Sequence, residues 1–378
     1  MATIIDYLNW RGDLSFDVSP FNEVDNYILA KIGCADYTGI VSEQAVSIPL
    51  PLAIERYYAL RGEAGDYFGA LASESMGPVL HRLPETVRFR ELRLSGYINK
   101  VIPKITEQFS ALTLTLPDGT HYVSFRGTDD TIAAWKENFM MSLDGTVPAQ
   151  RDAAEYLKWA ASVYPGSLIV GGHSKGGNLA VFAASSVSPE IQERITAVYN
   201  NDGPGFDEAF LSSEAYLRIE PKLVTLLPQY SIVGTLLTQA KNCTIVKSGR
   251  TGAAAHDGFN WEVLGTAFLR CERLSRSSRA FDETMEEMLQ RMDQKEREEF
   301  IDTFFDLLTA SGAVTLTDIN EHKLRKAVEF GKGLYREKTV QKFAVDAAER
   351  MLKEYIILAA ESKIPVLGRL IKRNPKKG

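Results

Sequence analysis

The amino-acid sequence predicts an α/β protein whose mostly parallel sheet is covered by helices. Short apolar runs alternate with longer helix-like stretches through the middle of the 378-residue chain. The apolar runs lie at 167–170, 197–199, 223–227 and 244–246, and the stretches between them include 150–164 and 178–186. Because a parallel connection needs a crossover of about a dozen residues or more, this alternation favours parallel pairing.

A β-hairpin is predicted just before this region. Residues 111–116 alternate apolar and polar side chains with a period of two, and a second β-rich run follows at 120–125. The connection at 117–119 reads Pro-Asp-Gly. This combination favours a tight turn, because proline presets φ and glycine accepts a positive φ.

Helix-like segments flank the core on both sides. Residues 21–29 and 53–60 carry apolar residues at helical spacing, and charged helix-like stretches follow at 285–308 and 340–358. We therefore expect three parts, which are an N-terminal helical segment at 1–105 that packs on the core, an α/β core at 106–273, and a C-terminal helical region at 274–378.

The composition disfavours several classes of protein. The 43 Lys and Arg residues against 49 Asp and Glu residues give a formal net charge of −6, so the chain is a poor candidate for binding nucleic acid. The three cysteines are widely spaced and form no Cys-x-x-Cys pair. This spacing disfavours both a disulfide framework and a structural zinc site.

The sequence also predicts a cytoplasmic location. The first residues lack the basic and apolar regions of a secretion signal, and no stretch reaches about 18 uncharged apolar residues. The segment 364–377 is basic and partly apolar, which is compatible with contact to an anionic membrane surface. A solvated helix end is the favoured interpretation of that segment, and the sequence makes no prediction of oligomeric state.

The strongest chemical signal is the segment 172–176, Gly-His-Ser-Lys-Gly, which joins a β-like run to a helix-like run. In a nucleophile elbow a sharp strand-to-helix turn lifts a serine above the sheet, and small residues two positions before and after it leave room for the backbone. This makes Ser174 a candidate nucleophile. Taken alone, the motif is equally well explained as a glycine-rich turn with a capping serine.

An oxyanion hole needs two N–H donors near the nucleophile. The residue after the serine, Lys175, offers one at the start of the predicted helix. Thr128 follows the strand-like run 120–125 through Arg-Gly and offers the second. The alternative is a simple turn there, with Arg126 as a surface charge.

A serine needs a base within hydrogen-bond reach, and the chain has five histidines, at 81, 121, 173, 256 and 322. In hydrolases with a nucleophile elbow the base follows the serine along the chain, which leaves His256 and His322. His322 lies in the charged C-terminal region, whereas His256 lies in a loop just after the last β-like run. We therefore expect His256 to be the base and His173 to pack against the elbow.

These motifs resemble the class 3 lipases of the α/β-hydrolase superfamily. Those enzymes carry a Phe-Arg-Gly-Thr/Ser loop and a Gly-His-Ser-Leu-Gly-Gly-Ala-Leu-Ala elbow, which are similar to 125–128 and 172–180 here. The region 20–265 also looks like a bacterial branch of lipase-like proteins that shares the segments 201–206, 231–234 and 256–261. The resemblance implies an α/β-hydrolase fold, with Ser174 as nucleophile, His256 as base, and Thr128 with Lys175 at the oxyanion hole.

The carboxylate that would orient His256 departs from the class 3 pattern. Those lipases have an aspartate after the next-to-last strand, but the matching segment 227–233 holds no carboxylate. Asp202, at the end of the preceding strand, is the first candidate, and an aspartate of a Gly-Pro-Gly turn is an equally weighted alternative. Asp207 ranks second and Asp257 third, and a variant without a true acid stays open.

Together these residues predict a serine esterase or lipase-like hydrolase that acts on a small-molecule or lipid ester without cofactor or metal. The alternatives are a non-catalytic binding module on a hydrolase scaffold, or an acyltransferase. Residues 129–145 are a candidate lid. We expect the ammonium of Lys175 either near the mouth of the site, where it would favour anionic substrates, or in solvent.

Overall fold

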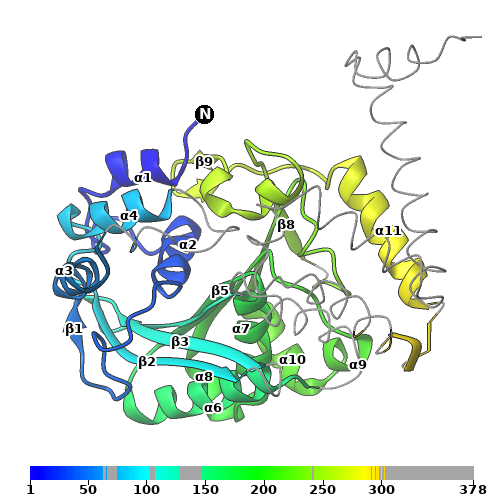
Figure 1. Ribbon diagram of the computed structural model, residues 1–378, viewed down its shortest axis with the longest axis horizontal. Helices are drawn as coiled ribbons and strands as arrows, with labels where there is room; N and C mark the ends of the chain where they lie inside the picture. Colours follow the sequence, from blue (N-terminus) through cyan, green and yellow to red (C-terminus); the bar gives the residue numbers. More distant parts are fainter. Residues whose placement is uncertain are drawn as a thin grey trace, which may run out of the picture.

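A computed structural model describes residues 1–62, 65, 75–102, 107–127, 146–240, 242–290, 292–293, 295–297, 299 and 302. Its centre is an eight-stranded sheet in which the strands lie side by side in chain order (Figure 1). The strands are β1 (Ile48–Pro49), β2 (Arg93–Ile102), β3 (Glu107–Thr115), β4 (His121–Phe125), β5 (Leu168–His173), β6 (Ile195–Asn201), β7 (Leu223–Pro228) and β8 (Cys243–Val246).

The sheet has an antiparallel half and a parallel half. Strands β1 to β4 pair antiparallel, and β4 to β8 pair parallel. The predicted hairpin is confirmed, since β3 and β4 pair with Thr115 opposite His121. Its turn closes through the Leu116 N–H, which donates to the Thr120 carbonyl at 2.8 Å. The predicted α/β architecture with a mostly parallel sheet is also confirmed.

The crossover helices lie together on one face of the sheet. They are α6 (Pro148–Val163), α7 (Lys175–Ser186), α8 (Pro189–Arg194), α9 (Glu208–Leu211) and α10 (Glu214–Ile219). Parallel strands that follow one another in order, with every crossover right-handed, put all the crossovers on the same side. A buried apolar cluster fills this layer, with Val123 and Val170 from the sheet and Leu157 and Leu179 from the helices.

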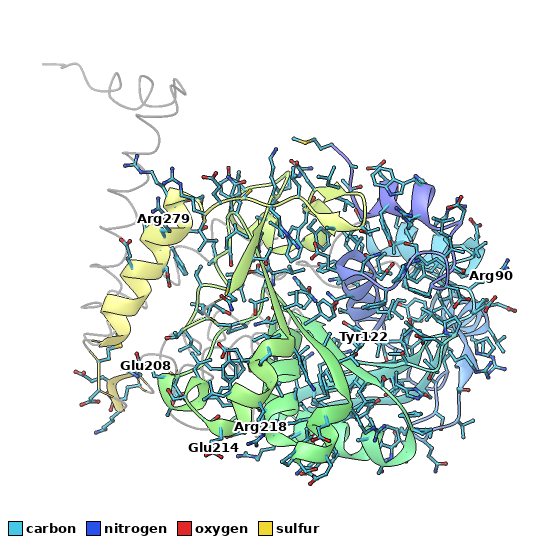
Figure 2. The ribbon with its side chains drawn as sticks, turned by 180° about the vertical axis from the view of Figure 1, so that it is seen from behind. Arg90, Tyr122, Glu208, Glu214, Arg218 and Arg279 are labelled. Atoms are coloured by element: carbon cyan, nitrogen blue, oxygen red, sulfur yellow. The ribbon has the colours of Figure 1, made fainter. Side chains whose placement is uncertain are left out.

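The opposite face is covered by N-terminal helices (Figure 1). These are α1 (Ile4–Arg11), α2 (Glu23–Ile32), α3 (Leu50–Arg61) and α4 (Met76–Arg82), followed by the short turn η2 (Leu83–Glu85). Helix α2 packs against β4 and β5. In this second apolar cluster Tyr27 and Ile28 are buried with Tyr122 and Ile169 of the sheet. Figure 2 shows Tyr122 in the interior and Arg279 on the outer helix α11 (Arg276–Gln290).

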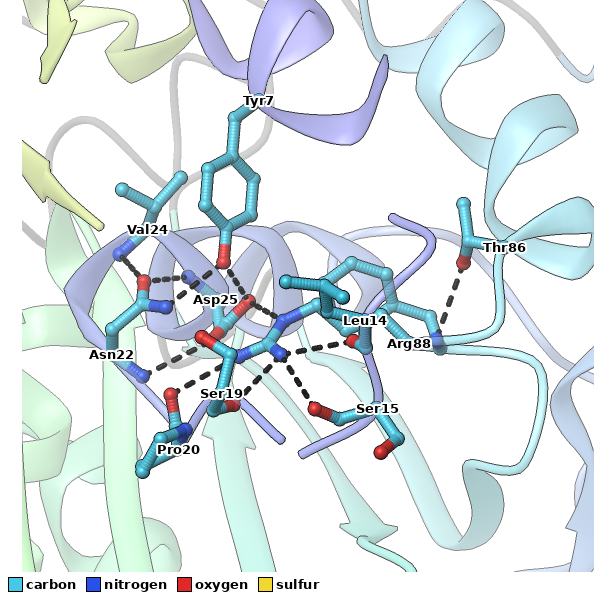
Figure 3. Close-up of polar contacts among 11 residues, drawn as sticks. Tyr7, Leu14, Ser15, Ser19, Pro20, Asn22, Val24, Asp25, Thr86 and Arg88 are labelled. Atoms are coloured by element: carbon cyan, nitrogen blue, oxygen red, sulfur yellow. Dashed lines mark hydrogen bonds and ion pairs between the residues drawn. The ribbon is translucent and has the colours of Figure 1, made fainter. Parts of the chain in front are cut away.

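A fully buried ion pair anchors α2 (Figure 3). The Arg88 Nε donates to Asp25 Oδ1 at 2.7 Å, and its Nη2 also contacts the Asp25 carboxylate. The same guanidinium donates to backbone carbonyls of the segment before α2, including that of Ser19 at 2.9 Å, and the Tyr7 hydroxyl donates to Asp25 at 2.8 Å. Burial raises the pKa of Asp25, while the bonds from Arg88 oppose that shift.

The sheet begins earlier in the chain than the pattern predicts. Strands β1 and β2 lie within 1–105, the segment expected to be helical. In β2 the register with β3 shifts between Ser95 and Ile98, and Gly96 has φ +66°. This bulge breaks the alternation of side chains and so conceals the strand. The boundaries near 105 and 274 stay predictions.

The C-terminal part is described only as far as residue 302. Helix α11 covers 276–290, so it begins before the helix predicted at 285–308 and overlaps its first residues. The helix predicted at 340–358 lies outside the described residues. Within the described part of the chain, no helix is both long enough and apolar enough for a membrane crossing.

Candidate active site

Ser174 lies in a sharp turn between β5 and α7. Its backbone has φ +59° and ψ −132°, a conformation that is strained for a residue with a side chain. The turn is closely packed, because a Cβ on Gly172 would lie 2.3 Å from the backbone of Gly176, and one on Gly176 would lie 2.1 Å from the Phe125 carbonyl oxygen. The two glycines around the serine are therefore required by this backbone.

The loop after β4 reaches the same turn. A Cβ on Gly127 would lie 3.3 Å from the Ser174 Cβ and 2.6 Å from the His173 carbonyl oxygen. Thr128 is the next residue in the chain, but it lies outside the described residues, as does the candidate lid at 129–145. Gly127 therefore lies against the turn at Ser174, and Thr128, the predicted second N–H donor, follows it directly in the sequence.

Lys175 opens α7, so its backbone N–H is at the helix N-terminus as predicted. The expectation for its side chain is wrong in both forms. Lys175 is fully buried, and its Nζ donates to the Gln108 carbonyl at 2.6 Å. Strand β3 extends past the end of β4, so that Gln108 meets the start of α7 and holds the ammonium inside.

His256 and Asp202 form a short hydrogen-bonded pair. His256 ends the turn η5 (Gly252–His256), and its Nδ1 lies 2.6 Å from Asp202 Oδ2. Asp202 directly follows β6 and is fully buried. The other candidate acids cap helices instead, since Asp207 accepts from the Phe210 N–H and Asp257 from the Phe259 N–H. Of the three predicted carboxylates, Asp202 is the one bonded to His256.

The second carboxylate oxygen of Asp202 is held by the loop after β7. Its Oδ1 accepts from the Ser231 hydroxyl at 2.5 Å and from the Gly234 N–H at 3.2 Å. Burial raises the pKa of Asp202, and the bonds from His256, Ser231 and Gly234 oppose that shift. The segment 227–233, which lacks a carboxylate, therefore supplies a donor to the carboxylate of the neighbouring strand.

His173 joins the turn at Ser174 to His256. The His173 Nε2 lies 2.8 Å from the His256 carbonyl oxygen, and the two ring centroids are 4.4 Å apart. A carbonyl oxygen only accepts, so His173 Nε2 carries the proton. Burial lowers the pKa of His173 well below 6.5. The prediction that His173 packs against the turn missed this bond, which joins the residue before Ser174 to the histidine that is bonded to Asp202.

Several supporting residues were not predicted. The Tyr27 hydroxyl of α2 accepts from the Gly258 N–H at 2.7 Å, at the start of η6 (Gly258–Asn260). The Trp261 Nε1 donates to the Ala255 carbonyl at 2.8 Å, next to His256. The His-Asp-x-Phe-x-Trp spacing at 256–261 was the one signal for these contacts, and it gave no hint of Tyr27.

A chain of buried amides supports the turn from below. The Asn201 side chain donates to the Gly172 carbonyl at 2.9 Å and accepts from Asn26 at the same distance. The Tyr122 hydroxyl donates in turn to Asn26 Oδ1 at 2.7 Å. Helix α2 is thus tied to β4 and to the carboxyl ends of β5 and β6. In the described residues no group of three or more His, Cys, Asp or Glu is arranged to hold a metal ion.

The architecture places the chain among α/β proteins of the hydrolase-like type, with a serine at the carboxyl end of a mostly parallel sheet. The chain belongs to the Mbeg1-like family, whose model matches residues 83–306, more than half of the sequence. No curated protein matches the sequence significantly.

Three solved structures show weak similarity to the chain, each at 14% sequence identity. A native Rhizomucor miehei lipase–propeptide complex has a TM-score of 0.32, covering 70% of this chain and 94% of that one. A mutant form of MDLA from Penicillium cyclopium has a TM-score of 0.35, covering 58% and 82%. M37 lipase has a TM-score of 0.32, covering 44% and 62%, less than two thirds of its length. At this level neither mechanism nor substrate transfers to this chain.

Proposed function

We propose that this chain is a serine hydrolase that cleaves carboxylic esters. The observation that carries the proposal is the double attachment of His256. Its ring bonds to buried Asp202 at 2.6 Å, and its carbonyl bonds at 2.8 Å to the residue that precedes Ser174. A base that is oriented by a carboxylate and attached to the residue before a serine on a sharp turn fits the arrangement that activates a hydroxyl.

The reaction proceeds in two steps. The Ser174 hydroxyl attacks the ester carbonyl, and His256 takes its proton and gives it to the departing alcohol, which leaves an acyl group on Ser174. Water then attacks the acyl group with the same proton transfers, and the acid is released. Asp202 holds His256 Nδ1–H, so that the other ring nitrogen is free to accept, and it stabilises the imidazolium. The N–H groups of Thr128 and Lys175 bind the oxyanion.

The substrate is a small-molecule or lipid ester, and the residues above account for the chemistry without a cofactor. The likeness of 125–128 and 172–180 to class 3 lipases supports this choice of substrate class. We also propose a cytoplasmic location, since the three cysteines are free thiols, as is usual in a reducing compartment.

Labelling by a fluorophosphonate probe tests the proposal. Wild type is expected to react, and Ser174→Ala is expected to be silent. Ser185→Ala is the matched control, because Ser185 lies on the same helix α7 but donates to the Val181 carbonyl, inside the helix. A folded wild-type chain that remains unlabelled would leave a non-catalytic binding module as the better hypothesis.

A panel of p-nitrophenyl esters of rising chain length then identifies the acyl group. Release of nitrophenol that depends on an added alcohol or thiol, without hydrolysis in buffer, would indicate an acyltransferase instead. Hydrolysis in water that Ser174→Ala removes supports the esterase.

A further inference from the structure

The imidazole of His173 has no step in the proposed hydrolysis, although the residue stands directly before the nucleophile. It is buried, with 8% of its surface exposed, and lies between two other aromatic rings. On one side is His256, at 4.4 Å between ring centroids, and on the other is Tyr27 of α2, which meets it edge-on at 5.4 Å. Its Nε2–H donates to the backbone carbonyl of His256 and not to a side chain.

We propose that His173 is a positioning residue that locks the base to the nucleophile through the His256 carbonyl. This role rests on the proposed function. Asp202 fixes His256 at its ring, and His173 fixes the same residue at its backbone. Because His173 is covalently joined to Ser174, the second bond sets the base relative to the serine itself and not only relative to the sheet.

The proposed proton transfer to His256 is favoured by a neutral His173. The groups that face it are His256, Lys31 and Tyr27, and the Tyr27 hydroxyl already accepts from the Gly258 N–H. Burial and the charges of His256 and Lys31 keep the pKa of His173 well below 6.5. A protonated His173 would place a cation beside the imidazolium that forms on His256 during attack, and would disfavour that step.

The geometry also explains why histidine suits this position. The bond requires a donor at the distance of Nε2 from the backbone, on a ring that fits between the tilted ring of His256 and Tyr27, which meets it edge-on. Glutamine carries an amide nitrogen at a similar distance. Asparagine is one carbon shorter, so its amide falls short of the His256 carbonyl. Leucine fills part of the space without any donor.

These three substitutions in the full-length chain form the test. We expect His173→Asn and His173→Leu to lower kcat for p-nitrophenyl esters and the rate of fluorophosphonate labelling by about 100-fold, with KM little changed, because a displacement of about 1 Å at a reacting group can cost that much. His173→Gln is expected to stay within about tenfold of wild type, since it retains the donor. Wild-type rates in His173→Asn and His173→Leu would overturn the proposal.

A second measurement does not depend on activity. Nitrogen-15 NMR of the imidazoles in wild type is expected to show His173 as the Nε2–H tautomer, and to show it still neutral as the pH falls through 6.5. The Nδ1–H tautomer would refute the lock even in a fully active enzyme, because it leaves no donor for the His256 carbonyl. Failure of the probe to label wild type would instead count against the proposed hydrolysis. The NMR result would still show whether His173 donates through Nε2–H.

Discussion

Replacing Asp202 with asparagine changes one atom of the buried pair and should disable the base. In Asp202→Asn the side-chain oxygen is expected to keep the bonds from Ser231 and Gly234, which both donate to Oδ1. The amide nitrogen then takes the place of Oδ2, 2.6 Å from His256 Nδ1. Because an amide nitrogen only donates, His256 must present a bare Nδ1 to it and carry its proton on Nε2.

That tautomer cannot take a proton from Ser174. An asparagine in place of the aspartate of a serine-protease triad lowers kcat by about 10⁴, which corresponds to about 5.5 kcal/mol. We expect a loss of this size for Asp202→Asn in hydrolysis of a p-nitrophenyl ester, with a parallel loss of fluorophosphonate labelling. The free energy of unfolding, measured in urea, should show that the variant remains folded.

Two matched variants sharpen the result. Asp207→Asn alters an aspartate that caps α9 and should leave kcat unchanged. Ser231→Ala removes one donor to Asp202, so the pKa of that carboxyl should rise further and the acid side of the pH–rate profile should move to higher pH. Activity of Asp202→Asn within tenfold of wild type would show that the pair does not orient the base.

Three further predictions concern stability, each measured by urea unfolding. Gly176→Ala should destabilise by about 3 kcal/mol, because its Cβ meets the Phe125 carbonyl oxygen at 2.1 Å, and a value near zero would contradict the tight turn. Arg88→Met should cost about 3–5 kcal/mol by leaving Asp25 buried without its partner, and Arg88→Met with Asp25→Leu should recover part of that loss. The pKa of His173 is lower in the folded than in the unfolded chain, so below pH 6.5 the unfolded state binds more protons. The free energy of unfolding should therefore decrease as the pH is lowered through this range, by up to about 1.4 kcal/mol per pH unit. His173→Gln should be less sensitive to acid than wild type, and an identical slope would contradict the buried neutral ring.

The strands could be predicted where a short stretch of sequence carries their pattern. Strands β3 to β8 alternate with turns and helices in a way that a short window of sequence reveals. Strand β2 could not be found in this way, because the bulge at Gly96 interrupts its period. The two short strands of the hairpin β9 (Val263–Leu264) and β10 (Ala267–Phe268) carry too few residues for any period.

The residues of the candidate site were predictable from strand order, whereas their contacts were not. Asp202 and His256 each follow a strand, so the carboxyl edge of a parallel sheet brings them near Ser174. The bond between His173 and His256 joins residues 83 positions apart, and that between Tyr27 and Gly258 joins residues 231 apart. No local pattern contains such pairs. The burial of Lys175 depends in the same way on how far β3 extends.

The strand order has a practical consequence for anyone shortening this protein. With the crossover helices of the described residues on one side, the other side of the sheet depends on residues that precede the family match at 83–306. A fragment trimmed to that match would lack α2, and Tyr122 and Ile169 would lose the helix that shields them from water. Trimming would also remove Tyr27 from the support of the His256 loop. Such a fragment should aggregate when expressed, and any soluble portion should hydrolyse esters poorly.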